Sequence, residues 1–340
     1  MKKGKQFFLG LDISKLFFDA SLLIVCGNAK QEIPQQQFAN NRAGLQLFEQ
    51  WLQRNDVTYD DTSLVIIENT GIYHRLVWKF CSSKGLPIHI GNAAHIKWSL
   101  GITRGKSDKI DAQRLSNYGY RHHEELQCTA ALSPVFLQLK DLMTNRTRLL
   151  QQLTGLRSYL KELKSVSDKN FAKQLTQYNK AAMDGFTKSI KAINAAITKL
   201  IESDKKIKAN YQLLLSVPGV GHWIALYLIC CTKNFSNGIT GKQLACYAGV
   251  VPFEHSSGIS IRGKNRVHKM ANKDLKRLLH LGALSAIKYY DEFKTYYNRK
   301  KEEGKHSMTV LNAIRNKIIL RAASVVNNRQ PYVNYSSSTV

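Results

Sequence analysis

The stretch FFLGLDIS, residues 7–14, decides how the first part of this chain folds. Its apolar run predicts a strand, and Asp12 lies inside that run, where a carboxylate is costly to bury unless something pairs with it. A second apolar run, SLVIIENTG at 63–71, reaches Glu68 just before a turn that contains Gly71. Both runs therefore predict strands that carry an acidic side chain.

The surrounding sequence alternates between strand and helix patterns from residue 6 to residue 125. The first three strands follow one another closely and should form an antiparallel meander. The order β-β-β-α-β-α-β-α predicts one α/β domain over residues 6–125. The expected strands are 6–13, 16–25, 32–39, 63–68 and 86–91, and the expected helices are 42–54, 72–84 and 108–122.

Two more carboxylates, Asp108 and Asp111, lie three residues apart at the start of the last helix pattern. Residues at i and i+3 share a helix face, so both can point at one site. Taken singly, Asp108 could cap its helix, and Asp111 could be favoured by the helix dipole. Taken with Asp12 and Glu68, they predict a site for Mg²⁺ or Mn²⁺, since two-metal phosphodiester chemistry needs carboxylates from several elements.

The charge balance points to a polyanionic partner. The 340 residues include 50 Lys+Arg and 24 Asp+Glu, which gives a formal charge of +26. Each Lys or Arg that contacts a phosphate releases condensed counterions, so this excess favours nucleic-acid binding over a merely basic soluble protein. An acidic cluster inside so cationic a chain indicates metal chemistry on a phosphodiester backbone.

The cysteines and the hydropathy pattern indicate a cytoplasmic protein. None of the six cysteines forms a C-x-x-C pair, which is typical of reduced thiols rather than a disulfide scaffold. Asp12 interrupts the first apolar run too early for a secretory signal. No uncharged apolar stretch reaches the roughly 18 residues that span a bilayer, so we expect no membrane partner.

The second part of the chain predicts mostly helices. Residues 135–208 repeat leucine and isoleucine in alternating steps of four and three, which indicates two long helices packed as an antiparallel coiled-coil hairpin. A bundle within one subunit and a dimerising arm both fit this pattern. Residues 211–326 predict a compact, mostly helical domain, and residues 327–340, without periodicity, predict a loose tail.

The helical domain begins with a glycine-rich turn. Pro218, Gly219, Val220 and Gly221 precede a helix pattern, as in a helix-hairpin-helix motif. Backbone N–H groups at Gly219 and Gly221 could bind a phosphate in such a turn. A tight turn between helices without any ligand is the alternative.

A serine pair in the same domain is a candidate nucleophile. Ser256 and Ser257 precede Gly258 in a predicted turn after Pro252. A hydroxyl in a cationic loop can approach and attack a phosphate if a base or a metal activates it. S-S-G is also an ordinary surface-loop sequence, which is the alternative. The cationic residues that follow the pair are Arg262, Lys264, Arg266 and Lys269.

These motifs, in this order, resemble a known family of transposases. The acids alone resemble the RNase H-like (RuvC-like) nucleases of the Holliday-junction-resolvase type. The full set resembles the DEDD insertion-sequence transposases (the "one-ten" insertion-sequence family), also called bridge-RNA-guided recombinases. It covers about residues 6–326 and comprises L-D-I-S-K, E-N-T-G-I-Y-H, K-S-D-K-I-D-A, V-P-G-V-G, A-C-Y-A-G-V-V-P with S-S-G, and K-x-x-N-K-x-L-K-R-L.

The resemblance implies roles for individual residues. Ser257 matches the family's nucleophile, with Ser256 as its rival, and would form a covalent phosphoserine link to DNA. The downstream motif adds Lys273 and Arg277 to the candidate nucleic-acid contacts. Asn69 and Ala271 depart from the family pattern, which leaves loop geometry open. The acids that match the DEDD tetrad and would bind Mg²⁺ are Asp12, Glu68, Asp108 and Asp111.

The resemblance also implies partners. A structured non-coding RNA would pair with target and donor DNA, and the protein would act as a homo-multimer, either a dimer or a tetramer, associated with the bacterial nucleoid. Two alternatives remain open from the residues alone. One is a metal-dependent Holliday-junction-type endonuclease that uses water while the serine loop grips DNA, and the other is a non-catalytic nucleic-acid-binding protein.

Overall fold

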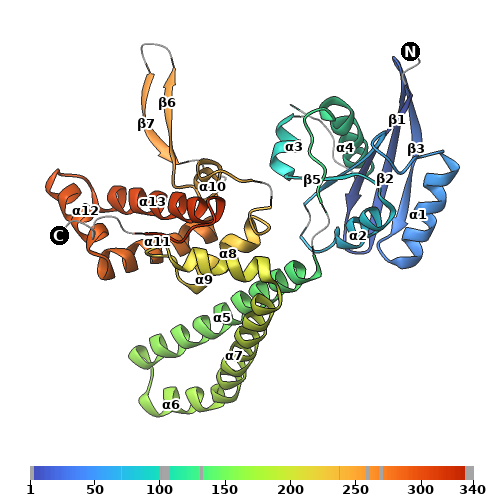
Figure 1. Cartoon of the computed structure of the whole chain (residues 1–340). Helices are drawn as coiled ribbons and strands as arrows, with labels where there is room; N and C mark the ends of the chain where they lie inside the picture. The colour runs from blue at the N-terminus through green and yellow to red at the C-terminus, as the bar shows by residue number, and fades with distance from the viewer. Residues whose placement is uncertain are drawn as a thin grey trace. The chain divides into compact units, whose positions relative to one another are not determined.

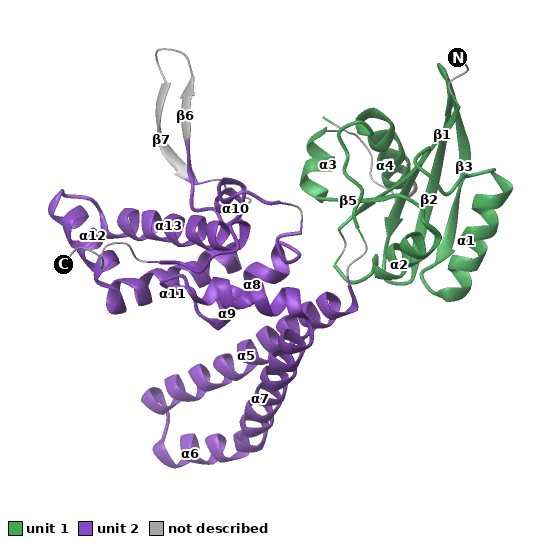
Figure 2. Ribbon diagram, viewed as in Figure 1, with its two compact units in different colours: residues 1–131 green, residues 132–340 purple. Residues whose placement is uncertain are grey.

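The chain divides into two units, residues 1–131 and 132–340 (Figure 2). For residues 108–109, 254–257 and 261–266 the computed structural model describes the backbone only. The first unit is a mixed α/β sheet domain and the second is mostly helical. The residues described are 4–69, 71–99, 101, 108–130, 133–236, 238–257, 261–267 and 271–333.

The first unit is built on a five-stranded sheet in the order β3-β2-β1-β4-β5 (Figure 1). β1, β2 and β3 form an antiparallel meander, and β4 and β5 run parallel to β1. The predicted strands and the meander are confirmed, with ends that differ by a few residues. The strands are β1 Lys5–Ile13, β2 Phe17–Cys26, β3 Ala29–Ala39, β4 Ser63–Glu68 and β5 Ile88–Gly91.

Helices cover both faces of this sheet. On one face, Phe48 of α1 packs edge-on against Phe18 and Phe38, with ring centroids 5.3 Å apart in both pairs. The predicted helices are confirmed, but the sequence analysis missed α3, whose seven residues bury only Ile96 and so give no amphipathic repeat. The helices are α1 Arg42–Arg54, α2 Arg75–Lys84, α3 Ala93–Ser99 and α4 Asp108–His122.

α4 lies against the other face, close to the backbone of β1. A Cβ on Gly10 would lie 2.0 Å from the Ala112 carbonyl oxygen and 2.3 Å from the Ser116 nitrogen. Further along α4, a Cβ on Gly119 would lie 2.1 Å from Ile66 of β4. Glycine is required at Gly10, since any side chain there would overlap the α4 backbone and push the helix off the sheet, whereas at Gly119 the overlap is with the end of the Ile66 side chain.

The second unit begins with an arm of three helices, α5 Pro134–Val166, α6 Lys169–Tyr178 and α7 Lys180–Ser203 (Figure 1). α5 and α7 pack together and bury residues seven apart, Leu153 with Leu160 and Ile190 with Ile197. The predicted pair of long helices is thus joined by a third helix. α6 starts because the Asp168 side chain accepts hydrogen bonds from the first backbone N–H groups of a new helix.

The remaining helices of the second unit surround one apolar core. α13 is its central element, with ten buried residues between Val310 and Val326. None of the helices in the described ranges is long and apolar enough to cross a membrane. These helices are α8 Lys205–Leu215, α9 His222–Cys231, α10 Gly241–Tyr247, α11 Lys273–Tyr289, α12 Asp291–Glu302 and α13 Ser307–Asn327.

A two-stranded antiparallel hairpin interrupts these helices, with β6 at Pro252–Ser257 and β7 at Ile261–Val267. The prediction that Ser256 and Ser257 lie in a turn is wrong, because both are in β6. The residues FEHSS and IRGKNR lack the apolar alternation of a half-buried strand, so the sequence gives no period-two signal.

Part of the expected tail packs onto the second unit. The Tyr332 backbone N–H donates to Ser216 Oγ at 2.8 Å, and the Tyr332 hydroxyl donates to Glu292 Oε2 at 3.0 Å. The tail prediction for residues 334–340 lies outside the described residues.

The contact between α4 and β1 predicts an effect on stability. Gly10→Ala should lower the free energy of unfolding of the first unit by about 1–3 kcal/mol, because the methyl group overlaps α4 backbone. Gly185→Ala, on α7 with nothing within 4 Å of its Cβ, is the control and should be neutral or slightly stabilising. Urea denaturation measures both, and equal effects of the two substitutions would contradict the close contact.

Candidate functional site

Asp12 and Glu68 come side by side at the ends of two parallel strands. The register pairs Leu11 of β1 with Ile67 of β4, so the next residue on each strand is one of the two acids. Paired residues of parallel strands direct their side chains to the same face. That face is the one α4 covers, because Ile66, two residues before Glu68, contacts α4. Both acids are half-buried.

The first turn of α4 carries the backbone positions of the other two predicted acids on the helix side that faces the sheet. Ala112 and Leu115 are buried against the sheet, and Asp108 and Asp111 lie four residues before them on the same helix side. Asp111 Oδ1 accepts a hydrogen bond from Arg114 Nη1 at 2.8 Å. The Asp108 side chain lies outside the described part of the chain.

The direction of α4 sets which end of the sheet these acids reach. Gly119, late in α4, lies beside Phe8, early in β1. Ala112 and Ser116 lie beside Gly10, so α4 runs antiparallel to β1. The start of α4 therefore points toward the end of β1 that carries Asp12.

The structure adds an acid that the sequence analysis missed. Asp19 of β2 is the register partner of Asp12 and is 4% exposed. The Gln37 side-chain amide of β3 donates to both carboxylate oxygens of Asp19, at 3.3 and 3.1 Å. A lone acid inside the apolar run FFDASLLIV is the same signal that identified Asp12, and it could have identified Asp19.

This donor set suits a hard divalent cation. Carboxylates that face one another across neighbouring strands repel, and a bound cation would offset that repulsion. Oxygen ligands from two strands and a helix start leave room for water and phosphate. Among the side chains described, no three Asp, Glu, His or Cys groups form a set that could hold a metal ion by themselves.

The serine pair belongs to the second unit. In the hairpin, Ser256 is the register partner of Arg262, and Ser257 is the partner of Ile261. Arg262, Lys264 and Arg266 all lie on β7, while Lys269 lies outside the described residues. The backbone therefore brings one predicted cation, Arg262, directly opposite a candidate nucleophile.

Asn272 anchors the base of this hairpin. Its Oδ1 accepts hydrogen bonds from the Tyr227 hydroxyl and from the Leu275 N–H that begins α11, both at 2.9 Å. Its Nδ2 donates to the Tyr247 hydroxyl at 2.7 Å. Burial raises the pKa of Tyr227 to about 12. The network ties α9, α10 and α11 together where β7 returns to the helices.

The glycine-rich turn between α8 and α9 packs on the core. Gly219 has φ +83°, and a Cβ there would lie 2.8 Å from the Gly282 carbonyl oxygen and 2.8 Å from Ile318 Cδ1. Packing against α11 and α13 is thus sufficient reason for this glycine. Gly221 is exposed, with nothing within 4 Å of a Cβ. Of the two, Gly221 is the exposed one, and its carbonyl oxygen accepts a hydrogen bond from the Ala225 N–H at 3.0 Å.

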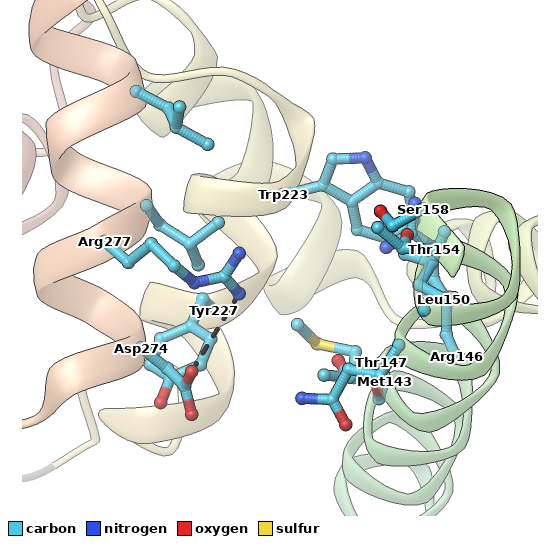
Figure 3. A pocket seen from close by; sticks show the side chains of 14 residues that line it. Met143, Arg146, Thr147, Leu150, Thr154, Ser158, Trp223, Tyr227, Asp274 and Arg277 are labelled. Carbon is cyan, nitrogen blue, oxygen red and sulfur yellow. Dashed lines mark hydrogen bonds and ion pairs between the residues drawn. The ribbon is translucent and has the colours of Figure 1, made fainter. Parts of the chain in front are cut away.

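A pocket of about 630 Å³ lies between α5, α9 and α11 (Figure 3). The Arg146 guanidinium stacks 3.2 Å from the centroid of the Trp223 ring. Arg277, a predicted nucleic-acid contact, lines this pocket and lies 3.9 Å from Asp274. Lys273, the other contact predicted on α11, is exposed.

Two family models match the chain along most of its length. One, described as "Transposase" and named for the DEDD transposases of IS110, matches residues 9–165, which include all four predicted acids. The other, described as "Transposase IS116/IS110/IS902 family", matches residues 211–298, which include the glycine-rich turn and both serines.

The chain is an insertion-sequence transposase of the IS110 family.

Known relatives of this transposase match the whole chain or parts of it. The pilin gene-inverting protein of Moraxella bovis is 27% identical over 332 residues, which cover 96% of this chain and 97% of the relative. The transposase for insertion sequence element IS1111A of Coxiella burnetii is 26% identical over 230 residues, 60% of this chain and 61% of the relative. An IS110 protein of Streptomyces coelicolor is 31% identical over 147 residues, 42% of this chain and 35% of the relative.

The Asn272 network predicts a pH-dependent stability. The folded transposase holds the Tyr227 proton up to a pKa of about 12, against 10.0 for an ordinary tyrosine. The contribution of the protonated Tyr227 hydroxyl to the free energy of unfolding is therefore complete below pH 10 and is lost as the pH rises toward 12. Tyr227→Phe should cost about 1 kcal/mol near neutral pH and should flatten this alkaline loss.

Urea denaturation between pH 8 and pH 11.5 measures both effects. Tyr289→Phe, which removes the hydroxyl of an exposed tyrosine on the same unit, is the matched control. An alkaline loss as steep in Tyr227→Phe as in the wild type would show that another group causes it.

Proposed function

We propose that this transposase cuts and rejoins DNA with a Mg²⁺-dependent acidic site and a serine nucleophile, guided by a structured RNA. Mn²⁺ would substitute for Mg²⁺. The observation that carries the proposal is the convergence of Asp12, Glu68 and the start of α4 on one end of one sheet face. The meander followed by parallel strands, with a helix across the acid-bearing face, supports an RNase H-like (RuvC-like) fold for the first unit.

The acids would position the cation and the scissile phosphate. Asp12, Glu68, Asp108 and Asp111 would hold the ion, and Asp19 would support Asp12 from the neighbouring strand. When bound, Mg²⁺ stabilises charge on the phosphoryl oxygens and lowers the pKa of a nearby hydroxyl. The Arg114 side chain keeps the Asp111 carboxylate in place through its ion pair.

The serine would form the covalent intermediate. Ser257 Oγ attacks phosphorus, a new P–O bond forms, and the bond to the leaving sugar oxygen breaks. The serine proton passes to a base, and the leaving oxygen takes up a proton. Attack by a sugar hydroxyl of another DNA end on the phosphoserine then releases the serine and reseals the strand. Ser256 is the rival nucleophile.

The proposal requires the two units to meet on the nucleic acids. The acids lie in the first unit and the serines in the second. They would come together in the assembled complex, within one chain or between subunits of a homo-multimer. The α5–α7 arm is a candidate surface for that assembly.

A recombinase fits better than a simple nuclease for one reason. One relative that matches over nearly its whole length is named for inverting a pilin gene. Inversion of a DNA segment requires that strands be rejoined as well as cut. A metal-dependent junction endonuclease would need the acids alone and would leave the serines without a chemical role.

Single substitutions test the chemistry. Asp12→Asn, Glu68→Gln and Ser257→Ala should each lower recombination of a plasmid bearing the element ends by about 10³-fold or more, because each removes a group acting in the transition state. Asp61→Asn and Ser285→Ala, which alter exposed residues of the same types, should recombine normally. Circular dichroism checks that every variant folds.

Trapped intermediates separate the mechanisms. Denatured reactions of the wild type with Mg²⁺ should contain DNA covalently attached to protein, and Ser257→Ala should contain none. Loss of the adduct in Ser256→Ala alone would assign the nucleophile to Ser256. Cleavage without any adduct would establish a hydrolytic nuclease, and the absence of cleavage would leave only a binding protein.

Guidance by RNA has its own test. RNA that co-purifies with the transposase should map to structured non-coding DNA beside its gene. Replacing the part of that RNA that pairs with the target should redirect recombination to the matching new sequence. Recombination that proceeds equally well after nuclease digestion of the RNA would contradict the guided mechanism.

A further inference from the structure

α13 carries a buried arginine that forms no ion pair with any of the side chains that the structure describes. Arg315 is 4% exposed, although it is charged at every physiological pH. Its Nη2 donates to His280 Nδ1 at 2.6 Å, and its Nε is buried with no hydrogen-bond partner in the structure. A buried charge is costly unless a partner neutralises it, so this position calls for an anion.

Two more cationic or titratable side chains surround Arg315. Lys276 and His280 lie one turn apart on α11, and both are half-buried. Burial lowers the pKa of both, and the charge of Arg315 lowers it further. In the described part of the chain, none of the three forms an ion pair with a carboxylate.

The same helix shows how this protein normally accommodates an arginine. Arg321, six residues after Arg315, pairs through both terminal guanidinium nitrogens, Nη1 and Nη2, with the Glu292 carboxylate. The Tyr332 ring packs on the same guanidinium, with 4.8 Å between the ring centroid and Arg321 Cζ. Among the described side chains, Arg315 has neither a carboxylate nor a tyrosine ring as a partner, and a ligand from outside the chain would supply one.

The cluster lies beside the base of the serine-bearing hairpin. Asn312, one turn before Arg315 and Asn316 on α13, donates from Nδ2 to the Val250 carbonyl oxygen at 2.8 Å. Val250 lies two residues before β6. At the same base, a Cβ on Gly249, before β6, would lie 2.1 Å from the Cβ of Ala271, after β7, so the segments before and after the hairpin pack together here.

We propose that Arg315, Lys276 and His280 form a binding site for a backbone phosphate of the nucleic acid on which this transposase acts. The guanidinium presents a planar set of donors that matches phosphate oxygens, and Lys276 adds a second positive charge. The half-buried Lys276 and His280 give the phosphate access to Arg315 from the surface of α11.

This phosphate is not the one that the serines attack. The five residue steps of β6 from Pro252 to Ser257 span about 17 Å. At 3.4 Å per nucleotide along a DNA strand, that corresponds to a phosphate about five steps away. The nucleic-acid identity of the ligand rests on the proposed function, whereas binding of the phosphate group does not.

Inorganic phosphate tests the site directly on the full chain. Thermal unfolding in phosphate and in chloride at equal ionic strength should show a higher Tm in phosphate for the wild type. Lys276→Gln and His280→Gln, at half-buried positions, should lose at least half of that difference. Lys294→Gln, which removes a charge from an exposed position on α12, should keep it.

Arg315→Met provides a more stringent form of the same thermal-unfolding test. Because it replaces an uncompensated buried charge with an apolar side chain, the variant should be no less stable than the wild type in chloride, and phosphate should add no further stability. An undiminished phosphate effect in both Lys276→Gln and His280→Gln would overturn the site even if Arg315→Met failed to fold.

Binding of a labelled 20-nucleotide DNA or RNA strand tests the source of the phosphate. Fluorescence anisotropy across salt concentrations should show weaker binding by Lys276→Gln, with a salt slope reduced by about one counterion relative to Lys294→Gln. If Lys276→Gln loses the Tm difference between phosphate and chloride but binds the strand with unchanged affinity and salt slope, the assignment to a nucleic-acid backbone is overturned. Neither measurement needs recombination, so an inactive serine would not affect the result.

Discussion

The close contact between α4 and β1 at Gly10 is the constraint on which the candidate site depends. Backbone atoms of Ala112 and Ser116 occupy the space that a side chain at Gly10 would fill. The contact fixes the distance and the direction of α4 over the sheet, so that its first turn points to the strand end bearing Asp12 and Glu68. An acid at the start of a helix has no fixed relation to a strand without such a contact.

In the second unit, contacts between distant segments also fix the position of a candidate site. The side chains that make these contacts lie at the base of the hairpin. Asn272 joins three helices where β7 ends, and Asn312 holds the segment that leads into β6. An isolated two-stranded hairpin is marginal in water, so such anchors at its base determine where the strands begin. Arg315, which forms no ion pair with a described side chain, lies among these anchors, so the proposed phosphate site would connect nucleic-acid binding on the helices with the position of the serines.

The strands were predictable because burial on one or both faces leaves a period in the sequence. Three of the missed elements leave none: α3 buries a single side chain, and β6 and β7 lack a regular alternation of apolar and polar residues. Asp19 was missed although its signal resembled that of Asp12, since only the register of β1 and β2 shows that the two acids are neighbours. The Arg315 cluster joins residues 35 positions apart on two helices, which no periodicity reports.

The sequence by itself determined the α/β order of the first unit, the helical character of the second, and the acids and serines that resemble the transposase motifs. Those features follow from local propensity, from apolar periodicity and from residue identity, all of which are properties of short segments. Tertiary structure alone decided which acids share a sheet end, which glycine serves packing, and which arginine is buried without an ion pair among the described side chains. Strand register, helix direction and burial depend on contacts between distant segments, and a linear pattern does not specify them.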